Sequence, residues 1–174
     1  MARVYDGQAI RAVRETDFEA IAAITNHYIA TTAIHFAYEP ITAGELVATW
    51  RAHPKHPYLV IEDAGALAGY AKAGVWRERS AYQWTCEVGL YIADDARGRG
   101  LGTALYAALL DECARGGFRS AIAGITLPND ASVALHARFG FRSLGVVRDA
   151  GYKLGRWHDV EFFQKPFTQE SAPA

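Results

Sequence analysis

The chain has 174 residues, 51% of them hydrophobic, and a formal net charge of −1. This length fits one domain with a sizeable core, which we assign to residues 1–167, with 168–174 as a frayed tail. The balanced charge argues against a broad nucleic-acid-binding surface, and no apolar run approaches the ~20 residues of a membrane span. Two cysteines and the lack of a secretory segment indicate a reduced, cytoplasmic protein.

The elements in chain order predict a mixed α/β sheet. Apolar periodicity and turn signals give strands and helices that do not follow a repeated βαβ pattern. The predicted strands are 9–13, 58–63, 67–76, 83–93, 120–126, 141–147 and 158–167. The predicted helices follow two capping-box patterns and two later turns, namely Thr16 with Glu19, Thr42 with Glu45, and starts near 101 and 130.

The strand predicted at 83–93 has two different faces. Alternation puts Cys86 among apolar neighbours on one face and Glu87 on the other. Core packing is therefore the expected role of Cys86, rather than that of a nucleophile. Gly89 is a candidate bulge, because glycine tolerates the backbone conformation that a bulge requires.

A glycine-rich turn, Arg97-Gly98-Arg99-Gly100-Leu101-Gly102-Thr103, follows this strand and opens a helix. Its glycines let several backbone N–H groups face one point, where the helix dipole favours negative charge. Its arginines add charge-assisted contacts to phosphate. The turn lacks the Gly-Lys-Ser/Thr of a nucleotide-hydrolysing loop and the third glycine of a dinucleotide site. It predicts a site for a phosphorylated ligand, with a simple helix-start turn as the alternative.

The pattern Arg97-x-x-Gly100-x-Gly102 resembles the pyrophosphate loop of the GCN5-related N-acetyltransferases. Residues 129–141 resemble the second signature of that superfamily, an asparagine followed by a short helix and Gly-Phe. The phosphinothricin and methionine sulfoximine N-acetyltransferase branch is the most similar, over nearly the whole chain. The segments that carry this resemblance are Ile24–Ile29, Ala81–Thr85, Leu127–Asp130 and Ala150–Val160.

The resemblance implies the fold of that superfamily, a mixed, mostly antiparallel, splayed sheet flanked by helices, with acetyl-CoA as cofactor. Its pantetheine would lie between two splayed strands, bonded to the backbone of Leu90 and Ile92. Asn129 would bond the pantetheine arm, cap its helix, or do both. The expected cofactor-binding set is Leu90, Tyr91, Ile92, Arg97, Gly98, Arg99, Gly100, Leu101, Gly102, Thr103, Asn129 and Ser132.

Glu87 and His136 are the catalytic candidates. Transfer to nitrogen needs a neutral amine, and a nearby carboxylate can take its proton, directly or through a water. The resemblance implies this role for Glu87, whose alternative is a simple pair with an arginine. His136 lies where many relatives have a tyrosine that protonates the departing thiolate, and its alternative is packing against the cofactor helix. A backbone N–H near Leu90 or Tyr91 would meet the oxyanion.

Five residues are expected at the substrate: Phe36, Trp76, Arg77, Arg79 and Tyr82. An amino-acid-like substrate carries a carboxylate, and phosphinothricin also a phosphinate, so arginines at the mouth of the site suit both. The two arginines are equally consistent with a polar surface loop, and Phe36 with the core.

The sequence thus predicts an enzyme that detoxifies by N-acetylation, acting on the α-amino group of phosphinothricin, methionine sulfoximine or methionine sulfone. As in the resembled branch, we expect a homodimer, with no metal, nucleic-acid or membrane partner. The alternatives are a protein or peptide N-acetyltransferase and a non-catalytic module that senses acetyl-CoA. The arginines and aromatic residues favour a closed small-molecule pocket over an open groove for a chain.

Overall fold

The computed structural model describes residues 3–5 and 8–167, and the tail predicted at 168–174 lies outside them. Within this part of the chain the strands are β1 (Arg3–Tyr5), β2 (Gln8–Ala12), β3 (Tyr58–Asp63), β4 (Ala66–Val75), β5 (Thr85–Ile92), β6 (Ser120–Thr126), β7 (Arg142–Lys153) and β8 (Arg156–Pro166). The helices are α1 (Phe18–Thr31), α2 (Ala43–Ala52), α3 (Leu101–Arg115) and α4 (Asp130–Arg138), with 3-10 turns η1 (Glu15–Asp17), η2 (Ser80–Tyr82) and η3 (Asp94–Ala96).

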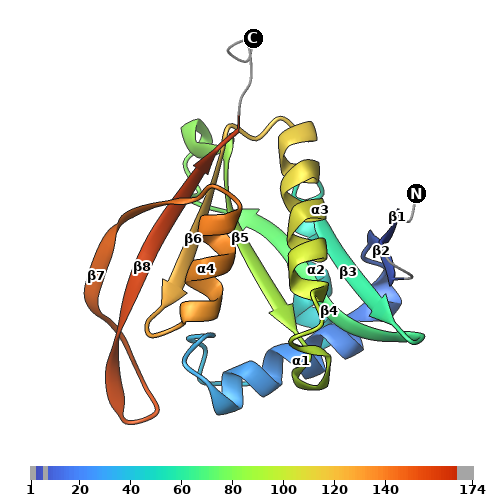
Figure 1. Ribbon diagram of the computed structural model, residues 1–174, viewed down its shortest axis with the longest axis horizontal. Helices are drawn as coiled ribbons and strands as arrows, with labels where there is room; N and C mark the ends of the chain where they lie inside the picture. The colour runs from blue at the N-terminus through green and yellow to red at the C-terminus, as the bar shows by residue number, and fades with distance from the viewer. Residues whose placement is uncertain (1–2, 6–7, 168–174) are drawn as a thin grey trace.

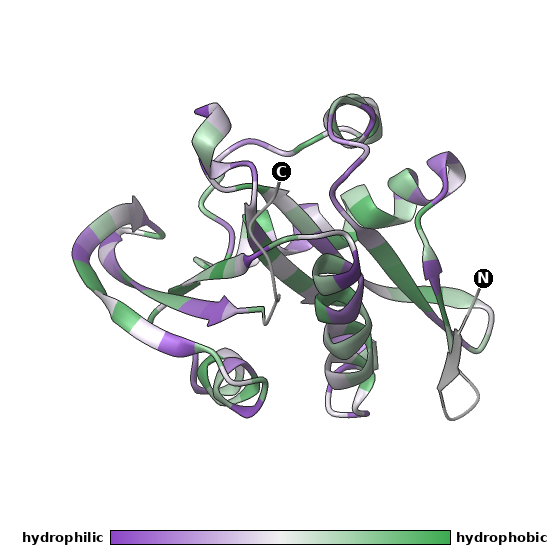
Figure 2. Cartoon of the chain, turned by 90° about the horizontal axis from the view of Figure 1, so that it is seen from above, coloured by the Kyte–Doolittle hydropathy of each residue, from purple (hydrophilic) through white to green (hydrophobic). Residues whose placement is uncertain are grey.

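The strands form one sheet in the order β1-β2-β3-β4-β5-β6-β8-β7. All neighbours are antiparallel except β5 and β6, which run parallel. Helices α3 and α4 lie on one face of the sheet, and α1 and α2 lie on the other (Figures 1 and 2). The predicted mixed α/β fold is therefore confirmed, and none of the described helices is long and apolar enough to cross a membrane.

Each face of the sheet has its own apolar core. Beneath α3, Leu101, Leu105 and Leu109 recur at a four-residue spacing and are buried, as the helical stripe predicted. Cys86 and Cys113 are buried in the same cluster. The other core lies between the sheet and α1, and its buried members are Val13, Phe18, Ile21, Ala22, Leu46, Tyr58, Val60 and Tyr70.

The start of α1 differs from the prediction, whereas the start of α2 agrees with it. Thr16 lies inside η1, so it does not cap α1. The turn is instead tied by Asp17, which accepts a bond from the Arg14 N–H at 2.7 Å and an ion pair from Arg11. The ion pair and the backbone bond of Asp17 thus take the place of the predicted Thr16 cap. The capping box of α2, between Thr42 and Glu45, is confirmed.

The bulge predicted at Gly89 is absent from the β4–β5 ladder, whose register is constant along all the paired residues of β5. The irregularity lies on the other edge of β5. There, pairing with β6 runs only from Thr85–Ser120 to Glu87–Ile122 and then stops. The two strands diverge beyond that point, which gives the splayed pair that the fold prediction required.

The β7–β8 hairpin is longer than predicted. The sequence 148–151 was expected to lie beyond the end of a strand, but β7 continues through it to Lys153 with register shifts after Ser143 and Val147. Asp149 adopts a positive φ of 47°, which absorbs the second shift. The hairpin extends away from the sheet at its β7 edge (Figure 1).

Candidate active site

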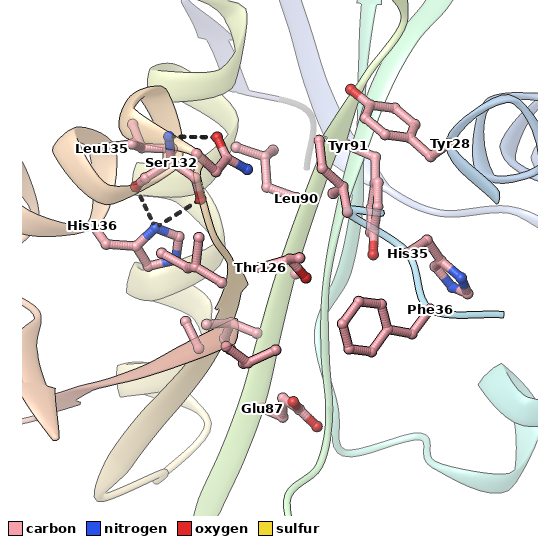
Figure 3. Close-up of a pocket in the computed structure, with 18 of the residues that line it drawn as sticks. Tyr28, His35, Phe36, Glu87, Leu90, Tyr91, Thr126, Ser132, Leu135 and His136 are labelled. Atoms are coloured by element: carbon pink, nitrogen blue, oxygen red, sulfur yellow. Dashed lines mark hydrogen bonds between the residues drawn. The ribbon is translucent and has the colours of Figure 1, made fainter. Parts of the chain in front are cut away.

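A cavity of about 920 Å³ opens where β5 and β6 diverge. Figure 3 shows its two sides: His136, Ser132 and Leu135 come from α4, and Tyr28, His35 and Phe36 face them from α1 and the segment that follows it. The strand β5 runs between these sides, and Glu87 lies toward one end of the cavity (Figure 3). The diverging strands thus provide an apolar gap with a carboxylate in it.

The β5 backbone turns unpaired N–H groups toward this gap. The Ala93 N–H donates to the Ala68 oxygen at 2.9 Å, which fixes the alternation of the β4–β5 ladder. By this alternation the N–H of Tyr91 faces β4, while those of Leu90 and Ile92 face the side where β6 has departed. Tyr91 therefore contributes its ring, not its N–H, to the cavity. Of the two residues expected to offer an oxyanion donor, the register thus leaves the N–H of Leu90 facing the gap.

The glycine-rich turn has the backbone conformation that an anion site needs. Gly98 and Gly100 adopt positive φ values of 75° and 80°. The first helical bond of α3 runs from the Ala104 N–H to the Gly100 oxygen, so the preceding N–H groups have no helical partner. A Cβ at Gly102 would lie 3.4 Å from the Leu90 side chain, and the helix start is thereby packed closely against β5.

The two arginines of the turn have different surroundings. Arg97 lines the cavity, forms an ion pair with Asp94 at 2.6 Å and stacks over the Tyr28 ring at 5.1 Å. Arg99 instead pairs with Asp63 at 2.6 Å, at the turn between β3 and β4. Of the two predicted phosphate contacts, Arg97 is thus the one that lies at the cavity.

The rest of the predicted cofactor set is divided between cavity and core. Asn129 and Ser132 both line the cavity, and the Asn129 side chain accepts the Ser132 N–H at 3.2 Å. The helix-cap role of Asn129 is therefore confirmed, and its amide also lies at the cavity. The Leu101 side chain is buried in the core, and that of Thr103 is outside the cavity lining. For Leu101, only the backbone N–H is available to an anion.

Glu87 lines the cavity and its carboxylate is open to it. The surrounding protein raises the pKa of Glu87 by desolvation, and the positive charges of Lys72 and Arg77 offset part of this. No ion pair between described residues includes Glu87, so its simple pairing with an arginine is not observed. Its carboxylate is available to a ligand.

Lys72 lines the cavity as well, and sequence reasoning missed it. It lies on β4 directly opposite Gly89 of β5. Desolvation lowers the pKa of Lys72, and the negative charge of Glu87 opposes this shift. A signal was present in the sequence, because a lysine flanked by Ala71 and Ala73 inside a strand is an unusual place for a charge.

Beside Tyr91 the cavity is lined by aromatic rings. The Tyr91 ring contacts Tyr28 edge-on and stacks with Tyr70, each at 5.1 Å between centroids. The Tyr28 hydroxyl donates to the Ile92 oxygen at 2.7 Å, which satisfies a carbonyl left unpaired by the divergence of β6. The tyrosines therefore fix the edge of the gap and line it.

Phe36 lies at the cavity, as predicted for a substrate residue, and is held there by the β7–β8 hairpin. A Cβ at Gly151 would lie 2.4 Å from the Phe36 ring, so the ring occupies space that only glycine leaves open. Lys153 is buried, and its ammonium donates to the Ile29 oxygen at 2.6 Å and the His35 oxygen at 2.5 Å. The hairpin thus holds the segment after α1 over the cavity.

His136 is buried and packs between the rings of Tyr106 and Phe141, each 5.0 Å away. Its Nδ1 lies 2.8 Å from the Ser132 carbonyl oxygen, which requires a proton on that nitrogen. Desolvation lowers the pKa of His136, so the imidazole is neutral at neutral pH. Both predicted surroundings, the cavity and the packed helix, are present.

The remaining predicted substrate residues lie elsewhere. Arg77, Arg79 and Tyr82 line a second cavity of about 500 Å³, at the other end of β5. Trp76 is outside the lining of both cavities, and its ring lies 5.9 Å from that of Phe162, which lines the first. Within this chain Arg79 does not stand at the mouth of the Glu87 site, because β4 ends before it and η2 turns the segment away. Arg77 also lines the second cavity, but it is near enough to Glu87 for its positive charge to lower the pKa of that carboxyl.

Cys86 is fully buried on the face opposite Glu87, with its Sγ 3.9 Å from the Sγ of Cys113. The core role predicted for it is confirmed. Among the described residues no group of three or more histidine, cysteine and acidic side chains is arranged to hold a metal. In the Trp157-His158-Asp159 segment, the buried His158 ring instead bonds the Lys153 oxygen at 3.0 Å.

Comparisons with known proteins agree with this architecture. The model of the acetyltransferase (GNAT) domain matches residues 10–161. Phosphinothricin N-acetyltransferase of Streptomyces viridochromogenes is 42% identical over 165 residues, which cover 94% of this chain and 90% of the relative. The L-methionine sulfoximine/L-methionine sulfone acetyltransferase of Salmonella typhimurium is 34% identical over 166 residues, covering 94% of this chain and 97% of the relative.

A solved structure is similar over nearly the same length. The GNAT superfamily phosphinothricin acetyltransferase from Sinorhizobium meliloti, in complex with acetyl-CoA, superposes with a TM-score of 0.89 at 32% identity. The match covers 92% of this chain and 88% of that one. Domain match, sequence identity and fold agree, and the chain belongs to the GNAT family of N-acetyltransferases.

Proposed function

We propose that this protein transfers the acetyl group of acetyl-CoA to the α-amino group of a small amino-acid-like substrate. Phosphinothricin, methionine sulfoximine and methionine sulfone are the first candidates, because the relatives named above are named for them. One observation carries the proposal: the open carboxylate of Glu87 lies in the same cavity as the unpaired backbone edge of β5. A proton acceptor and a groove for an extended ligand thus occur together.

The residues of the gap suit acetyl-CoA, which would supply the acetyl group as a thioester. Leu90 and Ile92 offer backbone N–H groups to an extended arm, as a missing strand would use them. The turn from Gly98 to Thr103 offers N–H groups to a diphosphate at the α3 start, with Arg97 adding a positive charge beside it. Asn129 and Ser132 border the same groove.

Glu87 fits the role of general base. An α-amino group has a pKa near ~8, so most of it is charged at neutral pH and cannot attack. A carboxylate whose pKa is raised by desolvation accepts this proton more readily than one in water. The proton passes from the ammonium to Glu87, directly or through one water, and leaves a neutral amine facing the gap.

Two further groups have distinct parts in this proposal. The Leu90 N–H is a fixed donor for developing negative charge, of a type that contributes about 3 kcal/mol in other acyl transfers. The Nδ1–H of His136 donates a hydrogen bond to the Ser132 carbonyl oxygen, and the imidazole is neutral because burial lowers its pKa. These contacts favour a packing role for His136, with the thiolate leaving without its help.

The partial cover over the cavity suits a small amine better than a peptide chain. Phe36 and the segment after α1 cover it, and contacts from Gly151 and Lys153 hold that cover in place. A protein or peptide acetyltransferase would need an open groove there. A sensor that only binds acetyl-CoA would have no use for an open carboxylate such as Glu87.

The deciding experiment measures CoA release from acetyl-CoA with phosphinothricin, methionine sulfoximine, methionine sulfone and a short peptide. Release with one of the three amino acids but not with the peptide is the expected result. Release with the peptide alone would favour the peptide acetyltransferase. If calorimetry detects binding of acetyl-CoA but no amine causes release of CoA, the result would favour the sensor.

We also propose that the protein is a cytoplasmic homodimer that detoxifies such amino acids. The β7–β8 hairpin exposes large apolar side chains, including Leu144, Leu154 and Trp157, which suits an interface between two copies. The two buried cysteines are close yet unbonded, which suits a reducing compartment. Sedimentation at micromolar concentration would give the oligomeric state.

A further inference from the structure

At the centre of the sheet two charged residues and two glycines lie at the corners of a square: Lys72 and Gly74 on β4, and Glu87 and Gly89 on β5. In the register of β4 and β5, Lys72 lies opposite Gly89 and Gly74 lies opposite Glu87. Directly opposite residues in an antiparallel pair project to the same face, and so do residues two apart along a strand. Both charged side chains therefore rise from one face, at diagonal corners, with bare backbone at the other two corners.

Packing does not account for the two glycines. A Cβ at Gly74 would lie 3.9 Å from the nearest atom, the backbone carbonyl oxygen of Glu87. A Cβ at Gly89 would lie 3.6 Å from the Tyr91 ring, which is ordinary contact, and neither glycine has a positive φ. The glycines instead keep free the floor between the two charges, and this floor is part of the cavity lining.

Lys72 and Glu87 attract each other but form no ion pair within 4.0 Å among the described residues. Desolvation lowers the pKa of Lys72, and its ammonium has no hydrogen-bonded anion among the described residues. A partly desolvated charge of this kind is costly unless a ligand supplies its partner. The cavity beside Lys72 is where that partner would come from.

The other cationic and titratable groups near this floor are otherwise engaged. Arg97 lines the cavity but is paired with Asp94. The ammonium of Lys153 is used by two carbonyl oxygens. His35 has its pKa lowered by desolvation and by the charges of Lys72 and Lys153, so its imidazole is neutral. Arg77 has its guanidinium over the Trp76 ring at 5.0 Å and lowers the pKa of Glu87 from the side of the second cavity.

We propose that Lys72 binds the α-carboxylate of the substrate while Glu87 faces its α-amino group. An α-amino acid carries an ammonium and a carboxylate on the same carbon atom. The Lys72–Glu87 diagonal presents a positive charge for the carboxylate and a negative charge for the ammonium. The Cα of the substrate lies over the floor left by Gly74 and Gly89. This inference rests on the proposed function and adds to it the residue that selects amino acids over simple amines.

A consequence for the base follows from the same geometry. The charge of Lys72 lowers the pKa of Glu87 in the free enzyme. A bound carboxylate neutralises that charge, so Glu87 gains proton affinity when an amino acid arrives. An amine without a carboxylate meets a weaker base, and Lys72 therefore affects turnover as well as binding.

The test compares methionine sulfone with 3-(methylsulfonyl)propylamine, the same molecule without its carboxylate. Dissociation constants are measured by calorimetry on CoA-saturated enzyme, and kcat/KM is measured with acetyl-CoA. Lys72→Met should raise the dissociation constant of methionine sulfone about 10- to 100-fold, the size expected for a charge-assisted hydrogen bond. The dissociation constant of the amine should change less than about threefold. Lys72→Arg should recover part of the loss. Lys165→Met, on β8 outside both cavities, is the matched control.

Several outcomes would overturn the role of Lys72. The first is a wild-type enzyme that does not prefer methionine sulfone over the amine. The second is a Lys72→Met variant that keeps the preference. The third is an equal loss for both ligands, which would mean that Lys72 contacts the sulfone or supports the fold; retained binding of acetyl-CoA separates these two. Absence of acetyl transfer by the wild type counts against the proposed function, whereas the calorimetric comparison still decides the role of Lys72.

Discussion

The two sides of the cavity are built in different ways. The helical wall, formed by β6 and α4, continues into the apolar core beneath α3 through residues such as Leu135 and Ile125. The aromatic wall is formed by Tyr28, His35, Phe36 and Tyr91. Its His35 and Phe36 lie in the segment after α1, which adds no buried residue to the core between α1 and the sheet. One wall is held by apolar packing of neighbouring elements, and the other by contacts between distant parts of the chain.

Lys153 shows this difference most clearly. Its ammonium bonds the His35 oxygen across 118 residues of sequence, and the Tyr38 hydroxyl donates to the Tyr152 oxygen beside it. The two walls also differ in their proposed partners, since the cofactor groove borders the helical wall and the amine lies under the aromatic one. Changes to the helical wall should therefore leave binding of the amine unaffected, and changes to the aromatic wall should leave binding of acetyl-CoA unaffected. Each prediction below tests this independence.

The largest effect is expected from Glu87→Gln. Loss of the general base should lower kcat by about 100- to 10,000-fold near neutral pH. The dissociation constant of acetyl-CoA should stay within about twofold, because the amide keeps the shape of the side chain and the cofactor groove does not depend on its charge. Steady-state kinetics and calorimetry give the two numbers. Turnover that survives the substitution would remove Glu87 from the chemistry.

The acidic limb of the pH profile should sharpen this assignment. Glu87 must be ionised to accept a proton, and its pKa is raised, so kcat/KM should fall about tenfold per pH unit below that pKa. Lys72→Met removes a charge that lowers the pKa of Glu87, so the limb should move to higher pH. A limb that moves to lower pH, or does not move, would contradict the coupling between the two residues.

The helical wall was the more predictable of the two from sequence. The bounds of β6 agree with prediction, and the neighbouring α3 ends at Arg115 with Gly116 as its cap, as the two glycines indicated. Burial on one face of a regular helix or strand leaves apolar residues at a regular spacing, which a sequence shows directly. The glycine-rich turn and the Asn129 cap are short local signals of the same kind. Where neighbouring residues make the structure, a local pattern can predict it.

The aromatic wall was less predictable because its contacts join distant segments. Lys153 and Gly151 look like an ordinary hairpin tip in sequence, and only the fold brings them to Phe36. Lys72 is visible in the sequence as a charge inside a strand, but its relation to Glu87 depends on the register of β4 and β5. Arg79 was expected near Glu87, but the course of the chain after β4 carries it to another cavity.

Lys153→Met tests whether the hairpin holds the aromatic wall. The substitution leaves the carbonyl groups of Ile29 and His35 without their donor, which should cost about 1–3 kcal/mol of unfolding free energy. The KM for the amine should rise about tenfold, because Phe36 is no longer held over the cavity. Acetyl-CoA affinity should be unchanged. Thermal denaturation and kinetics measure both effects, with Lys165→Met as the control; a weaker grip on acetyl-CoA would mean that the walls are coupled.

Arg97→Gln makes the opposite test on the cofactor side. Loss of one positive charge beside the α3 start should raise the KM for acetyl-CoA about three- to tenfold. The KM for the amine should change less, although Arg97 also stacks over the Tyr28 ring of the aromatic wall. Arg99→Gln is the matched control, since Arg99 is paired with Asp63 away from the cavity. The wild-type advantage over Arg97→Gln should shrink as salt is added. Equal effects of both substitutions would mean that the turn attracts phosphate only through its general charge.

The smallest effect is expected from His136→Asn, and its smallness is informative. The asparagine amide can replace the Nδ1–H that bonds the Ser132 oxygen, so α4 keeps its position at the helical wall. A neutral imidazole whose pKa is lowered by burial has no spare proton to donate at neutral pH, so kcat should change less than about threefold. A proton donor would instead show a loss of about 100-fold and an altered alkaline limb in the pH profile. Measuring kcat across that limb therefore decides whether the helical wall only holds the cofactor or also takes part in the chemistry.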